Sequence, residues 1–259
     1  MSITYDAQTR IFHLATAHTS YIIGLDEGGA PLHLYWGARL ADPDVWAIQC
    51  MERPHVSFEV DTYFRPYEYP CHGTGDYRTP AARVLNADGN SVTSLKYVGH
   101  EIYAGKKPLD GLPAVYCAQQ ADAQTLELRL RDELTGLEVV LSYSAFDALD
   151  AICRSARYEN RGVQQLTLLT GVAASVDFFG NDYDILHLQG AWARERAPQR
   201  VPVSHGVYTI DSRRGASSHQ HNPFVALLSR DADEFHGDVW GFNFIYSGSF
   251  AATVESTAY

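Results

Sequence analysis

Hydrophobic and polar residues alternate with a period of two along most of this 259-residue chain. The clearest case is 125–131, where leucines at every second position alternate with charged residues. Turn residues at 132–136 separate this run from a second apolar run at 137–143. A strand that is apolar on one face and charged on the other belongs to an antiparallel sheet with one solvated side. The two runs therefore predict a β-hairpin, and helical periodicity is scarce elsewhere.

Similar runs predict a chain built almost entirely of strands. They lie at 10–16, 20–26, 32–37, 81–85, 91–104, 151–159, 165–177, 185–189, 207–211, 225–229, 239–246 and 251–259. Turn residues separate them at short intervals, which is typical of all-β sandwiches. About a dozen or more strands exceed the number in an immunoglobulin-like domain. The pattern therefore predicts an all-β fold, a large antiparallel two-sheet sandwich.

One predicted strand and the loops before it differ in character. The run at 239–246 places aromatic side chains on one face, namely Trp240, Phe242, Phe244 and Tyr246. We interpret it as a core strand, because aromatic side chains bury the largest apolar area per residue. The loop 217–223 is small, polar and closed by proline, so it is either surface or a site. The alternating charges at 194–196 could recognise a carboxylate, but such charges near a strand end are usually solvated or internally paired.

The segment 38–80 interrupts the alternation. It contains five prolines and several aromatic residues. A connection of this length in a compact domain is usually functional or disordered, and the aromatic content argues against disorder. We expect an ordered excursion that packs on another domain or on a neighbouring subunit.

The composition disfavours several classes of partner. The formal net charge of −11 argues against nucleic acid and anionic membranes, because both require a basic protein surface. No apolar run approaches the ~20 residues of a membrane helix, and no secretory signal precedes the first strand, so we expect a cytoplasmic protein. Cys50, Cys71, Cys117 and Cys153 are far apart and are expected to be free thiols. The sequence indicates neither a metal nor a cofactor.

Two short segments could carry chemistry. At 71–80 two glycines lie close to Asp76 and Arg78, which could bind a polar ligand or form an ion pair inside a tight turn. His219 and His221 stand two apart, a spacing that suits metal ligands, but without a third ligand a surface loop is the better interpretation. Glycosidase carboxylates cannot be paired from sequence, because the pair is defined by its separation across a sugar.

Several motifs occur in order along the chain. They are Y-W-G at 35–37, E-Y-P at 68–70, G-D-Y-R-T-P at 75–80, G-A-W-x-R-E-R at 190–196, S-x-x-G-x-S-S-H-x-x-N-P-F at 212–224 and G-F-N-F-x-Y-S-G-x-F at 241–250. Through these motifs the chain resembles the amino-terminal region of the glycoside hydrolase family 36 α-galactosidases. The last three motifs are long and therefore specific.

The resemblance implies a β-supersandwich of the galactose mutarotase type that precedes a (β/α)8 barrel. In the family the barrel supplies both catalytic aspartates of a retaining mechanism, which hydrolyses terminal α-galactosyl units of sugars such as melibiose or raffinose. We therefore expect residues 1–259 to form a single amino-terminal domain that stops before its last strands and is inactive alone. The implied partners are the barrel, an α-galactoside oligosaccharide and further subunits of a homo-oligomer.

The resemblance also implies residues that approach the sugar. In relatives that assemble as oligomers, an acidic residue and an aromatic residue after Y-W-G reach the galactose end. Glu52 and Trp46 are the nearest matches, although 37–61 departs from those relatives in length and sequence. Asp76 and Arg78 match a family motif and either bind sugar or brace the barrel.

Two other functions are compatible with the sequence. A β-sandwich with exposed aromatic residues could be a free-standing carbohydrate-binding module, because a fold does not determine a function. The chain could also be an aldose epimerase-like enzyme that uses a histidine and a carboxylate. Its candidate histidines are His187, His205, His219 and His221, but the sequence offers no recognisable acid partner for them.

Overall fold

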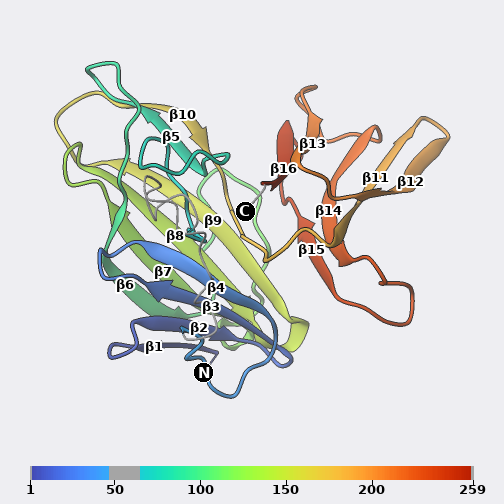
Figure 1. Ribbon diagram of the computed structural model, residues 1–259, viewed down its shortest axis with the longest axis horizontal. Helices are drawn as coiled ribbons and strands as arrows, with labels where there is room; N and C mark the ends of the chain where they lie inside the picture. Colours follow the sequence, from blue (N-terminus) through green and yellow to red (C-terminus); the bar gives the residue numbers. More distant parts are fainter. Residues whose placement is uncertain (1, 47–64, 258–259) are drawn as a thin grey trace, which may run out of the picture. The chain divides into compact units, whose positions relative to one another are not determined.

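The computed structural model describes residues 2–46 and 65–257, and they form an almost entirely β structure (Figure 1). These residues contain no α-helix and only two short 3-10 helices, η2 (Gln120–Asp122) and η3 (Asp147–Leu149). No helix among them is long and apolar enough to cross a membrane. Every pair of neighbouring strands is antiparallel. The predicted all-β, antiparallel fold class is confirmed.

The strands follow one another closely along the chain. They are β1 (Ile3–Asp6), β2 (Ile11–Ala15), β3 (Thr19–Leu25), β4 (Pro31–Ala38), β5 (Ala82–Leu85), β6 (Lys96–Ala104), β7 (Gln124–Arg131), β8 (Leu137–Phe146), β9 (Ala151–Asn160), β10 (Thr167–Gly171), β11 (Tyr183–Ala191), β12 (Arg194–Pro202), β13 (Gly206–Ser212), β14 (His221–Ser229), β15 (Val239–Asn243) and β16 (Phe250–Ser256).

The strands group into two compact units. The first unit comprises Met1–Lys107 and Cys117–Asp177, and the second comprises Pro108–Tyr116 and Phe178–Tyr259. Each unit has its own sheets and its own hydrophobic core. Whether the two units together form the predicted single domain is not tested by this division, so that prediction stays a prediction.

The first unit is a sandwich of two four-stranded sheets. One sheet has the order β1-β2-β3-β4, the other has the order β6-β7-β8-β9, and β5 and β10 form a separate pair (Figure 1). Phe12 and Ile23 from the first sheet share one core with Leu128 and Leu141 from the second. The alternating leucines of the predicted hairpin are fully buried in β7, so this part of the sequence pattern is confirmed.

The first sheet is buried on both of its faces. Ile22 of β3 points away from the main core and packs in a second cluster with Val45. Trp46 lies against this outer face, and any side chain at Gly24 would collide with its indole ring. A strand with both faces covered is apolar at successive positions, which explains why the burial of β3 is nearly continuous.

The described ends of the 38–80 segment pack on the first unit itself. The amide of His33 in β4 donates to Pro66 O at 2.7 Å, and the amide of Glu68 donates to Pro31 O at 3.0 Å. Residues 65–68 therefore extend the hydrogen bonding of β4. Residues 47–64 lie outside the described part, so the predicted packing on a barrel or neighbouring subunit stays a prediction.

A buried carboxylate joins the two sheets of the first unit. Glu68 is fully buried, and Nη2 of Arg154 in β9 lies 2.6 Å from its Oε1. The hydroxyl groups of Tyr21 in β3 and Tyr143 in β8 donate to the same carboxylate at 2.7 and 2.8 Å. Nδ1 of His33 in β4 lies 3.3 Å from Oε2. Side chains from both sheets therefore meet at one residue of an irregular segment.

The charges around Glu68 offset its burial. Burial alone would raise the pKa of this carboxyl, but the Arg154 guanidinium and the His33 hydrogen bond hold the pKa below its ordinary value. Burial raises the pKa of the Tyr21 and Tyr143 phenols well above the ordinary value, so both hydroxyls keep their protons and donate. The Arg154 guanidinium also lies 4.7 Å from the centre of the Tyr143 ring, a favourable cation–π distance.

The second unit is a smaller sandwich. A four-stranded sheet of order β12-β11-β14-β15 packs against the pair β13-β16 (Figure 1). Ile185 and Val225 from the sheet share a core with Ile210 and Phe250 from the pair. The predicted strand at 251–259 corresponds to β16, which pairs along its whole length with β13.

Two strands lie outside the predicted runs, and several predicted boundaries were wrong. β1 precedes the run that we expected to be first, and β12 lies at 194–202 where no strand was predicted. Most residues of β12 are exposed, so alternation could not reveal it, and only its pairing with β11 defines it. The runs at 91–104 and 165–177 were predicted too long, because only β6 and β10 within them pair with neighbours.

The aromatic strand at 239–246 is only partly a core strand. β15 is an edge strand that ends at Asn243, and Phe178 packs on Trp240 and Phe242 with ring centroids 5.3 and 6.5 Å apart. Phe244 and Tyr246 lie beyond the strand and are 41% and 42% exposed. The core interpretation is therefore wrong for these two rings, because the chain leaves the sheet before reaching them.

Removing the buried carboxylate should destabilise the first unit. The substitution Glu68→Gln leaves the Arg154 guanidinium buried without a counterion, so we expect the free energy of unfolding to fall by roughly 3–5 kcal/mol in urea titrations. The control is Lys107→Gln, which breaks an exposed 3.8 Å pair with Glu127 and should cost less than about 1 kcal/mol. Equal losses in both variants would contradict the proposed importance of Glu68.

Candidate functional site

Two of the predicted site residues form an internal ion pair. Oδ2 of Asp76 lies 2.8 Å from Nη2 of Arg78, and Oδ1 accepts hydrogen bonds from Nε and the backbone amide of the same arginine. Nη1 of Arg78 donates to Asp177 at 2.8 Å, and Nη2 donates to Arg65 O at 2.6 Å. The structure thus gives Arg78 a bracing role in the first unit. Sugar binding by this pair stays a prediction.

The charged form of Asp177 is stabilised by Arg78. Burial raises the pKa of its carboxyl, and the Arg78 guanidinium opposes that rise. Arg78 therefore holds two carboxylates, Asp76 in its own turn and Asp177 at the end of the first unit. Its hydrogen-bond donors are largely used within the protein.

Of the other two predicted residues, only Trp46 belongs to the described part of the chain. Trp46 is half-buried, its Nε1 donates to Thr9 O at 2.8 Å, and its ring covers Gly24. The structure therefore shows a packing role for Trp46. Glu52 lies outside the described residues. The predicted contacts of both residues with substrate stay predictions.

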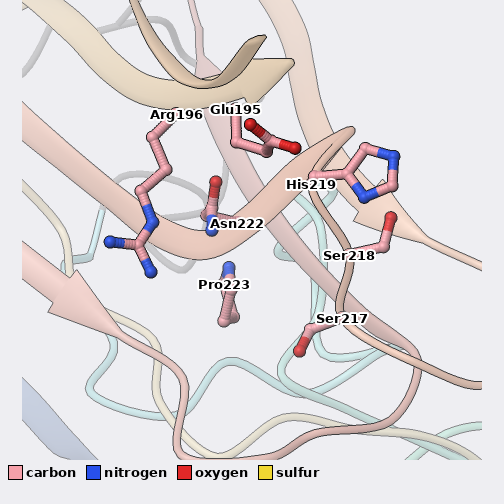
Figure 2. A pocket seen from close by; sticks show the side chains of 7 residues that line it. All are labelled: Glu195, Arg196, Ser217, Ser218, His219, Asn222 and Pro223. Carbon is pink, nitrogen blue, oxygen red and sulfur yellow. The ribbon is translucent and has the colours of Figure 1, made fainter. Parts of the chain in front are cut away.

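A polar pocket in the second unit collects residues from two of the sequence motifs (Figure 2). Its volume is about 630 Å³. The lining residues are Glu195, Arg196, Ser217, Ser218, His219, Asn222 and Pro223. The first two belong to the motif at 190–196 and the rest to the motif at 212–224. Segments about twenty residues apart in sequence therefore meet at one site.

A β-bulge places the charged side chains at the pocket. In the pairing of β11 with β12, Gln189 faces Ala197 and Ala191 faces Arg194, so Glu195 and Arg196 together oppose the single residue Gly190. A side chain at Gly190 would collide with the carbonyl oxygen of Arg194, so the close approach requires glycine. Bulges of this kind redirect side chains and are frequent beside functional sites.

The bulge holds Arg196 in a strained backbone conformation. Its φ is +58°, in the left-handed region that non-glycine residues rarely occupy. The cost is about 1–2 kcal/mol for a residue with a Cβ atom. Strained residues of this kind cluster at functional sites, where the surrounding structure maintains them.

The loop that completes the pocket is tied to the third motif. The amide of Ser217 donates to Ser247 O at 2.8 Å, and the amide of Gly215 donates to Oγ of Ser249 at 3.0 Å. The amide of Gly190 in the β11–β12 hairpin donates to Gln220 O at 3.4 Å. The three specific motifs therefore form one connected structure around the pocket.

Several polar side chains of the pocket have no partner within the described chain. No hydrogen bond or ion pair involves the side chains of Arg196, Ser217, His219 or Asn222 in residues 2–46 and 65–257. Oδ1 of Asn222 is buried and also unsatisfied. Figure 2 shows Glu195 and Arg196 extending to opposite sides of Asn222. Polar side chains that line a pocket without protein partners are typical of a binding site.

The epimerase candidates His187 and His221 contact neutral groups. Nδ1 of the exposed His236, which was not a candidate, lies 2.9 Å from the Asp233 carboxylate. Nε2 of His187 lies 2.9 Å from the Tyr208 hydroxyl, and Nδ1 of His221 donates to Asp211 O at 3.0 Å. The rings of His187 and His221 meet edge to face at 5.7 Å. The described residues contain no group of three or more ligands that could hold a metal ion. This arrangement gives no support to an epimerase-type pair of histidine and carboxylate.

Comparison with known proteins identifies the family. Residues 29–259 match the glycosyl hydrolase family 36 N-terminal domain. The chain belongs to this family. It is 46% identical over 264 residues to the α-galactosidase AgaA of Geobacillus stearothermophilus, covering 98% of this chain and 36% of that protein. It is 39% identical over 263 residues to the bifunctional α-galactosidase/sucrose kinase AgaSK of Mediterraneibacter gnavus, covering 98% of this chain and 28% of that protein.

The fold agrees with solved structures of the same family. A doubly substituted AgaA in complex with raffinose superposes with a TM-score of 0.92 at 43% identity, covering 96% of this chain and 36% of that one. The family 36 chain therefore corresponds to an amino-terminal domain and spans about a third of these relatives. The resemblance inferred from the motifs is confirmed.

Sequence reasoning recognised the pocket motifs but did not assign a site to them. The expectation that the charges at 194–196 are solvated or internally paired agrees with the exposure of Glu195 and Arg196. It did not predict the bulge, because a bulge leaves no mark on hydrophobic periodicity. Gly190, followed by a two-residue turn at 192–193, was the available signal. A glycine inside a strand pattern often marks a bulge or a close backbone approach.

Relieving the strain at the pocket should stabilise the family 36 domain. We expect Arg196→Gly to raise the free energy of unfolding by about 0.5–1 kcal/mol, because glycine adopts the left-handed conformation without a Cβ penalty. The matched control is Arg194→Gly on the same strand, which should lower it by about 0.5–1 kcal/mol because glycine weakens a regular strand. Urea unfolding measures both, and destabilisation by Arg196→Gly would show that the arginine contributes more than strain.

Acid should destabilise the second unit through His187. Burial lowers the pKa of His187 below its ordinary value of about 6.5, and the nearby His221 lowers it further. The unfolded chain therefore takes up a proton at higher pH than the folded chain, so stability is lost as pH falls below about 6.5. His187→Gln should reduce this loss in unfolding experiments between about pH 7.5 and 5, whereas Tyr208→Phe, which keeps the imidazole, should preserve it. An unchanged pH dependence in His187→Gln would contradict the assignment.

Proposed function

We propose that the chain is the amino-terminal, non-catalytic domain of a retaining α-galactosidase that hydrolyses terminal α-galactosyl residues of oligosaccharides. The observation that carries this proposal is the match, over 96% of this chain, to an α-galactosidase solved in complex with raffinose. The substrate class follows from that relative, since raffinose carries a terminal α-galactosyl unit.

The buried carboxylates of the domain support a non-catalytic role. Glu68 is held by Arg154, and Asp76 is held by Arg78. Asp184 in the second unit accepts from Nε of Arg200 at 2.6 Å. A retaining glycosidase needs one carboxylate as nucleophile and one carboxyl as acid, about 5–5.5 Å apart across the glycosidic bond. Carboxylates bound to arginines inside a sandwich stabilise the fold instead, so the catalytic pair belongs to the remaining two-thirds of the enzyme.

The proposed whole enzyme contains a (β/α)8 barrel and forms a homo-oligomer. In this enzyme the segment 38–80 approaches the barrel or a neighbouring subunit, and Glu52 and Trp46 approach the substrate. Among the described cysteines, Cys71, Cys117 and Cys153 are free thiols, which is consistent with a reducing compartment and supports a cytoplasmic location.

The purified 259-residue chain should not hydrolyse an aryl α-galactoside. The same chain joined in place of the matched third of AgaA to the rest of that enzyme should restore hydrolysis of the aryl galactoside and of raffinose. The expected reason is that the domain completes a site whose catalytic groups lie elsewhere. Release of the aryl alcohol measures the first activity, and galactose release measures the second.

The truncated AgaA without any amino-terminal domain is the control and should be inactive or insoluble. Turnover by the isolated chain would show that it carries its own catalytic groups. A folded chimera with no activity would contradict the proposed role as a galactosidase domain.

A further inference from the structure

The pocket at the β11–β12 bulge is built for a ligand that the chain itself does not supply. Arg196 stays in a left-handed conformation although glycine would fit the bulge at lower cost. In the described residues no hydrogen bond or ion pair of the Arg196 side chain offsets the backbone strain. The partner of this arginine therefore lies outside the described residues, in the rest of the enzyme or in a ligand, and a polar pocket at this position favours a ligand.

The chemistry of the lining fits a ligand with many hydroxyl groups. Arg196 and the Ser217 hydroxyl donate hydrogen bonds, and the Glu195 carboxylate accepts them. His219 and Asn222 can each do both. A hexose ring presents hydroxyls that donate and accept in the same way, so it could satisfy all of these groups together. The pocket volume of about 630 Å³ lies within the range of small-molecule sites.

The charges of the lining favour a neutral ligand. Glu195 and Arg196 are adjacent, so their formal charges cancel at the pocket. The lining therefore has no net formal positive charge from these two residues that would attract phosphate or carboxylate ligands. The domain as a whole carries a formal charge of −11, which also opposes anions.

We propose that this pocket is a binding site for a neutral hexopyranoside, carried entirely by the second unit. The guanidinium of Arg196 holds ring hydroxyls from one side of Asn222, and Glu195 and His219 hold them from the other side (Figure 2). The site binds sugar and performs no reaction. The existence of a sugar site is inferred from the pocket. The preference for a galactoside over other neutral hexosides rests on the proposed function.

Calorimetric titration of the 259-residue chain tests the proposal. The probes are methyl α-D-galactopyranoside and methyl α-D-glucopyranoside, and at least one should bind with a dissociation constant of about 1 mM, a value typical of small ligands held by a few hydrogen bonds. Arg196→Gly should weaken binding roughly tenfold or more, because a charged hydrogen-bond donor is lost. His219→Ala should weaken binding too, and it leaves the bulge untouched.

Arg194→Ala is the matched control, because this arginine lies on the same strand but does not line the pocket. It should leave the affinity unchanged. Arg196→Gly is expected to fold at least as stably as the parent chain, so weaker binding in this variant cannot be ascribed to unfolding.

Three outcomes would overturn the proposal. The first is the absence of saturable binding of either glycoside at concentrations roughly tenfold above 1 mM. The second is binding that Arg196→Gly and His219→Ala leave unchanged, which would place the sugar elsewhere. The third is tighter binding of sulfate than of either glycoside, lost in Arg196→Gly, which would make the pocket an anion site. Binding of the glucoside alone would support the site while separating it from the proposed galactosidase function.

Discussion

The ion pair between Glu68 and Arg154 is the interaction on which the first unit depends. A carboxylate this deeply buried would be too costly without a counterion, and its neighbours also need partners for their hydroxyl groups. Tyr21 and Tyr143 come from opposite sheets and donate to the same carboxylate. The arrangement therefore fixes how the two sheets face each other and where the chain returns before β5. The E-Y-P motif is conspicuous in the sequence because it carries this buried charge.

Arg78 applies the same principle at the end of the first unit. It holds Asp76 and Asp177 together and also binds the carbonyl of Arg65. In both networks the arginine and the carboxylates form ion pairs with each other inside the protein. Motifs that could have signified sugar recognition therefore act, in the described structure, as supports for irregular segments that regular sheet hydrogen bonds cannot hold.

The second unit is organised differently. Its specific motifs meet at a pocket where the side chains of Arg196, Ser217 and His219 have no hydrogen-bond or ion-pair partner in the described residues. A left-handed arginine in a bulge stores strain there, whereas the ion pairs of the first unit stabilise the fold. The two units of this family 36 domain therefore differ in how their charged and polar side chains are partnered.

The sequence by itself determined the fold class, the family and most of the strands. Period-two alternation is a local property, so runs such as 125–131 and 137–143 were predicted with their faces correctly assigned. It failed for β12, whose residues are mostly exposed and which exists through its pairing with β11. It also failed for Phe244 and Tyr246, because the point where a chain leaves a sheet depends on its neighbours.

Only the tertiary structure decided which polar residues are partnered. The sequence showed that Asp76 and Arg78 lie close together, but only the structure shows that they form an ion pair and that Asp177 binds the same arginine. The hydrophobic pattern did not link Glu195 with His219. The bulge lies within the β11–β12 hairpin, and the loop reaches it because β14 pairs with β11. Alternation along the chain indicates which side chains are buried. It does not indicate which residue partners a charged side chain, because that residue can be far away in the sequence.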